Sequence, residues 1–167
     1  MHNLVNMTDL KKILNPLYLS DIEIRKVVEL MFFAYREFTL GPDQILNEIN
    51  FGRAHHRIIY FVGKQKKITI KDLLSILQIT KQSLSRVLNQ LVEKKYIIVS
   101  TGNDKRTKNL SLTNLGIKLE EKLSQIQIDK INTIFKNTDE NNINGFKKIL
   151  YAMIDNKNKK KFDEINK

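Results

Sequence analysis

The segment from Thr80 to Gln90 carries short hydrogen-bonding and cationic side chains and no acid. A Gln amide can pair with the edge of adenine, and an Arg or Lys can pair with guanine or hold a phosphate. At the start of a helix, whose N-terminus itself favours phosphate, these residue types indicate contact with nucleic acid. Alternatively, the hydroxyls only cap the helix and the amides are solvated. The candidate contact residues are Thr80, Lys81, Gln82, Ser83, Ser85, Arg86 and Gln90.

Basic residues gather around this segment. The whole chain of 167 residues has a formal charge of +11. Residues 64–108 hold eleven Lys and Arg against three acids, so all other residues together contribute only +3. A lysine-rich composition spread over a plainly solvated surface would not concentrate charge in this way. The distribution therefore favours an anionic partner, and double-stranded DNA is the partner that we expect.

Two short helices joined by a tight turn are predicted to carry these residues. Thr69 and Asp72, three positions apart, predict a capped helix that runs to about Leu77. The turn follows, with the side chain of Ile79 expected to be buried in it, and Thr80 caps the second helix. This arrangement is typical of a helix-turn-helix. The second helix has its apolar residues at helical spacing: Leu84, Val87, Leu88, Leu91 and Val92.

A two-stranded hairpin is predicted directly after the second helix. Residues 96–101 and 109–113 have the β-rich or alternating apolar pattern of strands. The loop between them, residues 102–108, opens with a Gly-Asn turn and is basic. A hairpin in this position is a wing, and Lys105 and Arg106 in its loop are candidate DNA contacts.

Helices are expected on both sides of this region. Ser20 and Asp21 can cap a helix to about Phe38, whose apolar residues cover nearly its whole circumference and predict a subunit interface. A break at Gly41-Pro42 and a second helix to about Val62, ended by Gly63, come next. Thr113 can cap a long helix to about residue 135. A last amphipathic helix covers residues 143–154, and the charged tail 156–167 is expected to fray.

Several other classes of protein are not expected. The chain has no Cys, and it shows neither a Ser/His/Asp set nor a phosphate-binding Gly loop, so we expect no enzyme and no cofactor. His55 and His56 are adjacent, and adjacent residues on a helix point about 100° apart, so no metal site is predicted. No apolar run is long enough to span a membrane, and the first residues do not have the pattern of a secretory signal. A cytoplasmic location is the expectation.

Residues 68–120 resemble the MarR family of bacterial winged-helix transcriptional regulators. The resemblance rests on ITKQSLSRVLNQLVEKKYI, on the wing sequence NDKRTKNLSLTNLG, and above all on Asp104-x-Arg106 followed by Leu112-Thr113-x-x-Gly116. GRAHHRIIYFV is further similar to the PetP-like branch of this family. Two residues depart from the family pattern. Lys95 stands where Gly often precedes the wing, and Gln78 replaces a common Gly in the turn.

The resemblance implies a homodimer with interlocked terminal helices that binds a palindrome. It implies that Arg106 enters the minor groove beside the recognition helix and that Asp104 steadies the wing. It also implies a ligand pocket between the dimer helices and the DNA-binding lobe, suited to a small-molecule effector. Residues that could line such a pocket are Tyr35, Arg53, His55 and His56, although core packing or hydrogen bonds between helices explain them better.

The sequence thus predicts a mainly α-helical winged helix-turn-helix protein with a small β-hairpin wing. Residues 1–62 would contribute an arm and dimerisation helices, 63–113 the DNA-binding lobe, and 114–167 the C-terminal dimerisation helices and tail. The recognition helix would run over about 80–94. The alternative function is a winged helix that contacts protein or RNA. A protein-binding module should show exposed apolar or acidic residues on the outward face of 80–90.

Overall fold

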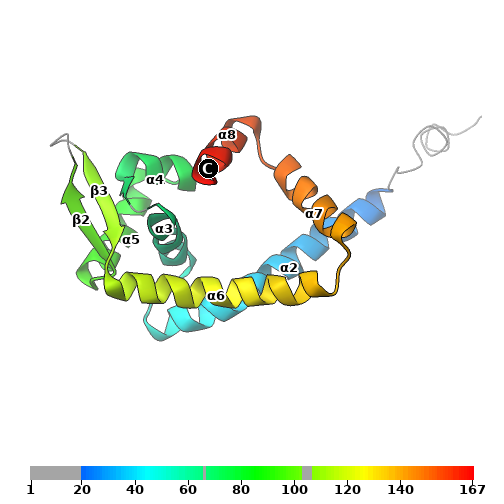
Figure 1. The fold of residues 1–167 in the computed structure, drawn as a ribbon, viewed down its shortest axis with the longest axis horizontal. Coiled ribbons are helices and arrows are strands. Elements are labelled where there is room, and N and C mark those ends of the chain that lie inside the picture. Colours follow the sequence, from blue (N-terminus) through cyan, green and yellow to red (C-terminus); the bar gives the residue numbers. More distant parts are fainter. Residues whose placement is uncertain (1–19, 66, 103–106) are drawn as a thin grey trace, which may run out of the picture. The chain divides into compact units, whose positions relative to one another are not determined.

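The computed structural model describes residues 20–65, 67–102 and 107–167. Helices make up most of this part of the chain, and three short strands form one sheet (Figure 1). Two units are distinguished, one ending at Phe38 and one beginning at Thr39. The elements in chain order are α2 (Asp21–Glu48), α3 (Arg53–Lys64), β1 (Ile68–Thr69), α4 (Ile70–Leu77), α5 (Lys81–Glu93), β2 (Ile97–Thr101), β3 (Lys108–Leu112), α6 (Asn114–Lys136), α7 (Glu140–Ala152) and α8 (Asn156–Ile165).

The first unit contains the start of α2, which begins at a capping box. The backbone amide of Glu23 donates to Ser20 Oγ, while the Glu23 carboxylate accepts from the backbone amide of Ser20 at 2.8 Å. The predicted helix start is confirmed. Apolar side chains on this stretch are exposed on all sides of the helix, with Phe32 72% and Leu30 67% exposed.

The predicted break at Gly41-Pro42 is wrong, because α2 continues through both residues to Glu48. A proline inside a helix removes one backbone hydrogen bond without necessarily ending the helix. Gly41 serves close packing here, since a side-chain carbon at this position would lie 2.7 Å from Ile126 Cγ2 of α6. The chain turns instead after Asn50, whose φ of 56° is left-handed, a conformation that Asn tolerates.

Gly63 does not end α3 as predicted. The helix runs to Lys64, and Gly63 lies inside it with an ordinary helical backbone. A side-chain carbon on Gly63 would lie 2.9 Å from Leu112 Cδ1 and 3.1 Å from Glu120 Cγ. The glycine therefore allows α3 to approach β3 and α6 closely.

The core of the second unit lies where α3, α4, α5, the sheet and the first half of α6 meet. The largest fully buried side chains come from every one of these elements, which makes the lobe a single packed body. Burial of such side chains contributes about 1.5–3 kcal/mol each relative to exposure. Core members include Leu46, Ile58, Ile59, Leu73, Leu84, Leu91, Ile97, Leu110 and Leu123.

The helix-turn-helix forms as predicted. Thr69 Oγ1 accepts from the backbone amide of Asp72 at the start of α4, and Thr80 does the same for Ser83 at the start of α5. Gln78 ends α4 with a left-handed φ of 51°. The predicted burial of Ile79 is wrong, because its side chain is 36% exposed. The buried side chains lie within the two helices instead, with Leu73 on α4 and Leu84 among those on α5.

The wing hairpin is confirmed, but the sheet has a third strand that was not predicted. β2 pairs antiparallel with β3, and Val99 lies opposite Leu110. β1 adds to the other edge of β3, with Ile68 also opposite Leu110. Two residues are too few to produce an alternating pattern, so β1 has no periodic signal in the sequence.

The junction between the wing and α6 is built on Thr113 and Gly116. Thr113 Oγ1 accepts from the backbone amide of Gly116 at 3.0 Å and so caps α6, as predicted. The Thr113 hydroxyl donates to the Lys95 carbonyl at 2.6 Å, and its backbone amide donates to the Tyr96 carbonyl at 3.0 Å. A side-chain carbon on Gly116 would lie 2.1 Å from that same Tyr96 oxygen.

The tail that was expected to fray forms the helix α8. Figure 1 shows α8 beside α4. The side chain of Asn158 accepts a hydrogen bond from Gln78, and Lys161 Nζ lies 4.0 Å from Asp72 Oδ1, so α8 contacts both ends of α4. Only Phe162 and Ile165 mark its apolar side, too weak a pattern to predict a helix from sequence. Within the described ranges, no helix is long and apolar enough to cross a membrane.

Gly116→Ala should lower the free energy of unfolding by at least about 2 kcal/mol, because the new methyl group would collide with the backbone oxygen of Tyr96. Gly52→Ala is the matched control, since no atom lies within 4 Å of its added carbon and its backbone is extended. That control should cost less than about 1 kcal/mol. Urea unfolding followed by far-UV circular dichroism measures both. Equal effects of the two substitutions would contradict this account of the junction.

Candidate nucleic-acid interface

α5 has one buried face and one polar face. Leu84, Val87, Leu88 and Leu91 are buried, whereas the predicted contact residues between Lys81 and Gln90 are exposed. A shallow depression lies on the outward surface of the helix, and Asn89 is one of the residues that line it. Asn89 was not among the contact residues predicted from the sequence. Asn89 lies three residues after Arg86 and seven after Gln82, a helical spacing that could have indicated that it shares their face. The depression is lined by Lys81, Gln82, Ser85, Arg86 and Asn89.

The first two candidate hydroxyls are engaged with each other. Thr80 Oγ1 accepts from the backbone amide of Ser83 at 3.1 Å and donates to Ser83 Oγ at 2.8 Å. Both side chains therefore contribute to the cap of α5. Contact of either one with DNA stays a prediction.

A histidine of α3 supports α5 from the other side. The backbone amide of Gly52 donates to His55 Nδ1 at 3.1 Å, so the proton of the neutral ring lies on Nε2. That Nε2 is 2.7 Å from Gln90 Oε1, which accepts the hydrogen bond. The His55 ring is buried and stacks on Phe51, with centroids 4.3 Å apart. The oxygen of Gln90 thus links α5 to α3, and the contact of Gln90 with DNA stays a prediction.

The C-terminal end of α5 is held by a cation and a left-handed residue. Lys94 Nζ donates to the Ile49 carbonyl at 2.8 Å and lies 4.7 Å from the centre of the Phe51 ring. Lys95 has a φ of 62°. Its amide donates to the Val92 carbonyl, and the amide of Tyr96 donates to the Leu91 carbonyl. This is a Schellman motif with Lys where Gly is usual, at a cost of about 1 kcal/mol.

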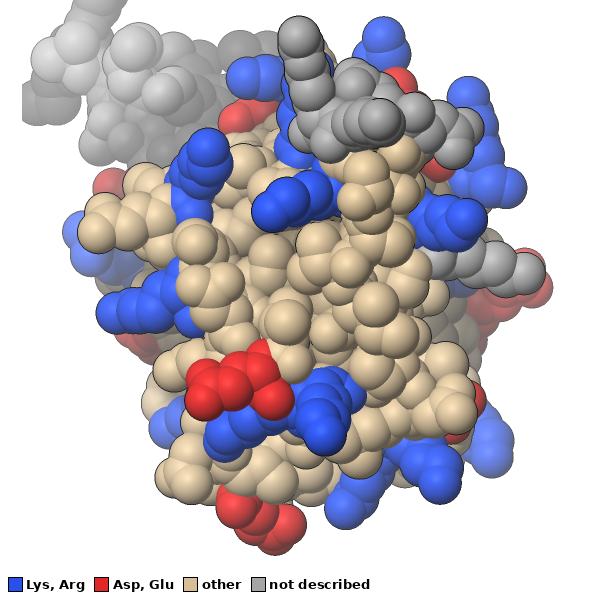
Figure 2. All heavy atoms as spheres, turned by 90° about the vertical axis from the view of Figure 1, so that its left-hand side faces the viewer, with Lys and Arg blue, Asp and Glu red and all other residues tan. Residues whose placement is uncertain are grey.

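Basic side chains surround the face of the molecule that bears α5 and the wing. Figure 2 shows this face, with Lys and Arg side chains around a neutral centre and few acids. At the base of the wing loop, the amide of Gly102 donates to the Thr107 carbonyl at 2.8 Å. The predicted wing residues Asp104, Lys105 and Arg106 lie outside the described residues.

The four predicted pocket residues lie on two helices. Tyr35 belongs to the part of α2 in the first unit, and the other three belong to α3. Arg53 forms an ion pair with Asp43 at 2.7 Å, and His55 serves the link to Gln90. The structure therefore favours hydrogen bonds between helices for these two. Among the described residues, no group of three or more His, Asp or Glu could hold a metal ion.

Comparison with known proteins identifies the fold and the family. The model of the MarR family matches residues 49–107. The chain is 41% identical over 140 residues to the HTH-type transcriptional regulator PetP of Rhodobacter capsulatus, covering 83% of this chain and 84% of that protein. This chain belongs to the MarR family. It is accordingly a transcriptional regulator of MarR type and not an enzyme.

Solved MarR-type structures share the winged-helix fold. The MepR–DNA complex of S. aureus is 27% identical, with a TM-score of 0.60 over 75% of this chain and 94% of that chain. NadR in complex with 4-hydroxyphenylacetate is 22% identical, with a TM-score of 0.63 over 81% of this chain and 93% of that chain, and shows the likeness of fold. The predicted winged helix-turn-helix class is confirmed.

Stability should depend on pH through His56. Burial lowers the pKa of its imidazole from the ordinary 6.5, more than the carboxylates of Asp43 and Glu120 raise it, and Arg57 lowers it further. Below pH 6.5 the unfolded chain therefore binds this proton more readily than the folded chain does, so stability falls as the pH falls. Urea unfolding between about pH 7.5 and 5.5 should show a smaller loss of stability for His56→Gln than for the unaltered protein. Parallel pH profiles would contradict this.

Proposed function

We propose that this MarR family member binds double-stranded DNA as a homodimer, on a palindromic site. In this arrangement α5 enters the major groove and the wing, residues 102–108, lies at the adjacent minor groove. The polar outward face of residues 81–90 on α5, which holds no acid and lies opposite a buried apolar face, is the observation that carries the proposal. The alternative, contact with protein, would require exposed apolar or acidic side chains on that face.

The depression on α5 suits the reading of base edges. Gln82 and Asn89 each offer an amide that can pair with adenine, and Arg86 between them can pair with guanine. Lys81 and Ser85 complete the surface. The outward side chains of α5 are held in place by the opposite side of the helix, where Leu84 and Leu91 are fully buried. Rigid support of this kind is what a sequence-reading helix needs, since a base contact depends on geometry.

The wing supplies affinity more than sequence preference. Arg106 and Lys105 would meet phosphates and the negative potential of a narrow minor groove, while Asp104 steadies the loop. The basic surroundings of α5 in Figure 2 extend the same attraction. MepR, which shares the fold at 27% identity, has been solved in complex with DNA, and this supports the assignment.

Exposed apolar side chains support the homodimer. On α2 the residues from Ile22 to Tyr35 include many large apolar side chains that are at least two-fifths exposed. On α7 the apolar face is exposed too, with Ile149 at 64%. Surfaces of this kind mark interfaces between proteins. A two-fold dimer would carry two α5 helices and so match a palindrome.

Gln82→Ala and Arg86→Ala should each weaken binding to the preferred site by about 1–3 kcal/mol, because each removes a paired contact with a base edge. The preferred site is first selected from a random duplex library by the unaltered protein. Binding isotherms are then measured on that site and on a shuffled duplex of the same length at the same salt.

Gln125→Ala, an exposed glutamine on α6, is the matched control and should leave both isotherms unchanged. Loss on both duplexes alike would show that Arg86 holds phosphate. If neither substitution changes the ratio of specific to nonspecific affinity, α5 is not the sequence reader.

Ile149→Asp should raise the dimer dissociation constant by at least about tenfold, because it places a charge in the centre of the apolar face of α7. Asn144→Asp adds the same charge on the opposite, exposed side of that helix and should leave the dimer intact. Analytical ultracentrifugation over a range of concentrations measures both. A dimer equally strong in the two variants would remove α7 from the interface.

A further inference from the structure

Gln90 differs from the other predicted contact residues of α5 because its side chain is shared with α3. The residue is exposed, and it lies four positions after Arg86 and eight after Gln82, so the three occupy one face of the helix. Its Oε1 accepts the hydrogen bond from His55 Nε2 at 2.7 Å, and the His55 ring is buried. One end of the amide is therefore turned toward the core, while the residue stays accessible from outside.

This hydrogen bond determines which end of the amide is available to a partner. A glutamine amide has an oxygen that accepts hydrogen bonds and a nitrogen that donates two. His55 holds the oxygen, and within the described ranges no residue accepts a hydrogen bond from the Gln90 nitrogen. The outward end of Gln90 is thus a donor, which suits a partner that offers acceptor oxygens, such as a DNA phosphate.

The donor of His55 is itself held in place. The His55 ring stacks on Phe51, with centroids 4.3 Å apart, and its Nδ1 accepts from the backbone amide of Gly52. The Gln90 amide is therefore oriented before any partner arrives. Little side-chain entropy remains to be lost when the contact forms.

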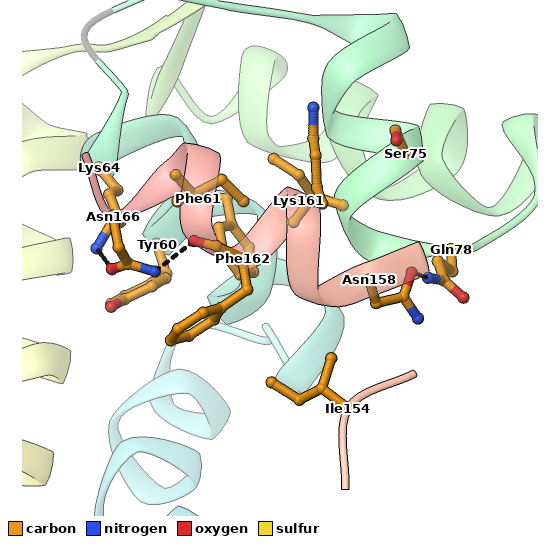
Figure 3. Close-up of a pocket in the computed structure, with 12 residues that line it drawn as sticks. Tyr60, Phe61, Lys64, Ser75, Gln78, Ile154, Asn158, Lys161, Phe162 and Asn166 are labelled. Carbon is orange, nitrogen blue, oxygen red and sulfur yellow. Dashed lines mark hydrogen bonds between the residues drawn. The ribbon is translucent and has the colours of Figure 1, made fainter. Parts of the chain in front are cut away.

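The helix α3 also has a partner on its other side. Figure 3 shows Phe61 and Lys64 of α3 beside α8. They lie six and nine positions after His55, which places them on the side of the helix away from it. Lys64 Nζ donates to Asn166 Oδ1, directly after α8, at 2.7 Å. α3 thus lies between α8 and α5, which limits its movement relative to α5.

The position of Gln90 along α5 indicates which part of the DNA it would meet. Eight residues of α-helix span about 12 Å, which is about the width of the major groove. The first residues of a recognition helix contact the base edges. When Gln82 reads a base, Gln90 accordingly lies at the border of the groove, where the phosphates are.

Building on the proposed binding of DNA by α5, we propose that Gln90 donates a hydrogen bond to a backbone phosphate oxygen and that His55 positions this contact. A neutral amide releases no counterions, so the contact adds affinity without adding to the salt dependence. It also requires α5 to be seated in one register. It therefore stabilises the specific complex more than nonspecific complexes, which are held mainly by charge.

Two substitutions at position 55 separate the hydrogen-bond donor from the aromatic ring. His55→Phe keeps a ring beside Phe51 but has no donor, whereas His55→Gln loses the ring but places an amide nitrogen near the position of Nε2. Affinities are measured on the selected preferred site and on the shuffled duplex at several salt concentrations. His55→Phe should lower the ratio of specific to nonspecific affinity by at least about threefold without changing the salt slope, and His55→Gln by less than about twofold.

A double-mutant cycle tests whether His55 acts through Gln90. Gln90→Ala alone should lower the ratio by at least about threefold, and adding His55→Phe to it should have no further effect. Gln90→Glu still accepts from His55 but repels phosphate, so it should weaken binding further than Gln90→Ala does. Gln125→Glu on α6 is the matched control for the added charge. Circular dichroism melts verify folding, and if His55→Phe unfolds, the comparison of Gln90→Ala with Gln90→Glu decides.

The proposal is overturned if His55→Phe leaves the ratio unchanged, if His55→Gln loses as much as His55→Phe, or if the losses at 55 and 90 are additive. It is equally overturned if Gln90→Glu binds as well as the unaltered protein. Losses for Gln82→Ala and Arg86→Ala without any loss at positions 55 and 90 contradict this proposal alone. No loss at any of the four positions removes α5 from the reading of DNA and overturns the proposed function as well.

Discussion

The close packing of Gly116 against the Tyr96 carbonyl joins four elements at one point. The carbonyl lies between the end of α5 and the start of β2, and it accepts the amide of Thr113 at the end of β3. Thr113 in turn caps α6. This one backbone oxygen contacts the chain where β3 ends and α6 begins. The angle between α5 and the wing therefore depends on this contact. A side chain at Gly116 would separate the strands from the helix.

The same lobe combines two ways of holding α5. The apolar face of α5 is buried in the core, and this burial stabilises the helix without fixing its rotation about its own axis. Two hydrogen bonds restrict that rotation, since each requires a particular orientation of the helix. One runs from His55 to Gln90, and the other runs from Lys94 to the Ile49 carbonyl. Polar contacts near an apolar core thus set where the outward side chains point. α3 is therefore more than a core helix, because its His55 helps to orient the outward face of α5.

Local signals predicted the centre of the lobe well. Caps at Thr69, Thr80 and Thr113 and the helical spacing on α5 placed the helix-turn-helix, and the alternation after it placed the wing. The errors came from tertiary packing, which local patterns do not report. The glycines at 41 and 63, which were read as breaks, allow α2 and α3 to approach α6 closely. The helix α8 forms because it contacts α4, which lies far away in the sequence. The link from His55 to Gln90 spans thirty-five positions and carries no local signal.

Because Gln90 is hydrogen-bonded to His55 of α3, the outward positions of α5 fall into two groups. Some can be substituted without affecting the core, whereas one also helps to hold the helix in place. Residues 82, 85, 86 and 89 point outward around the depression, and no core contact depends on them. Residue 90 also faces outward but shares its oxygen with His55. A combinatorial library designed to test the proposed reading of bases by α5 is therefore confined to the first four positions. Randomising residue 90 as well would mix changes in recognition with changes in the rotation of the helix.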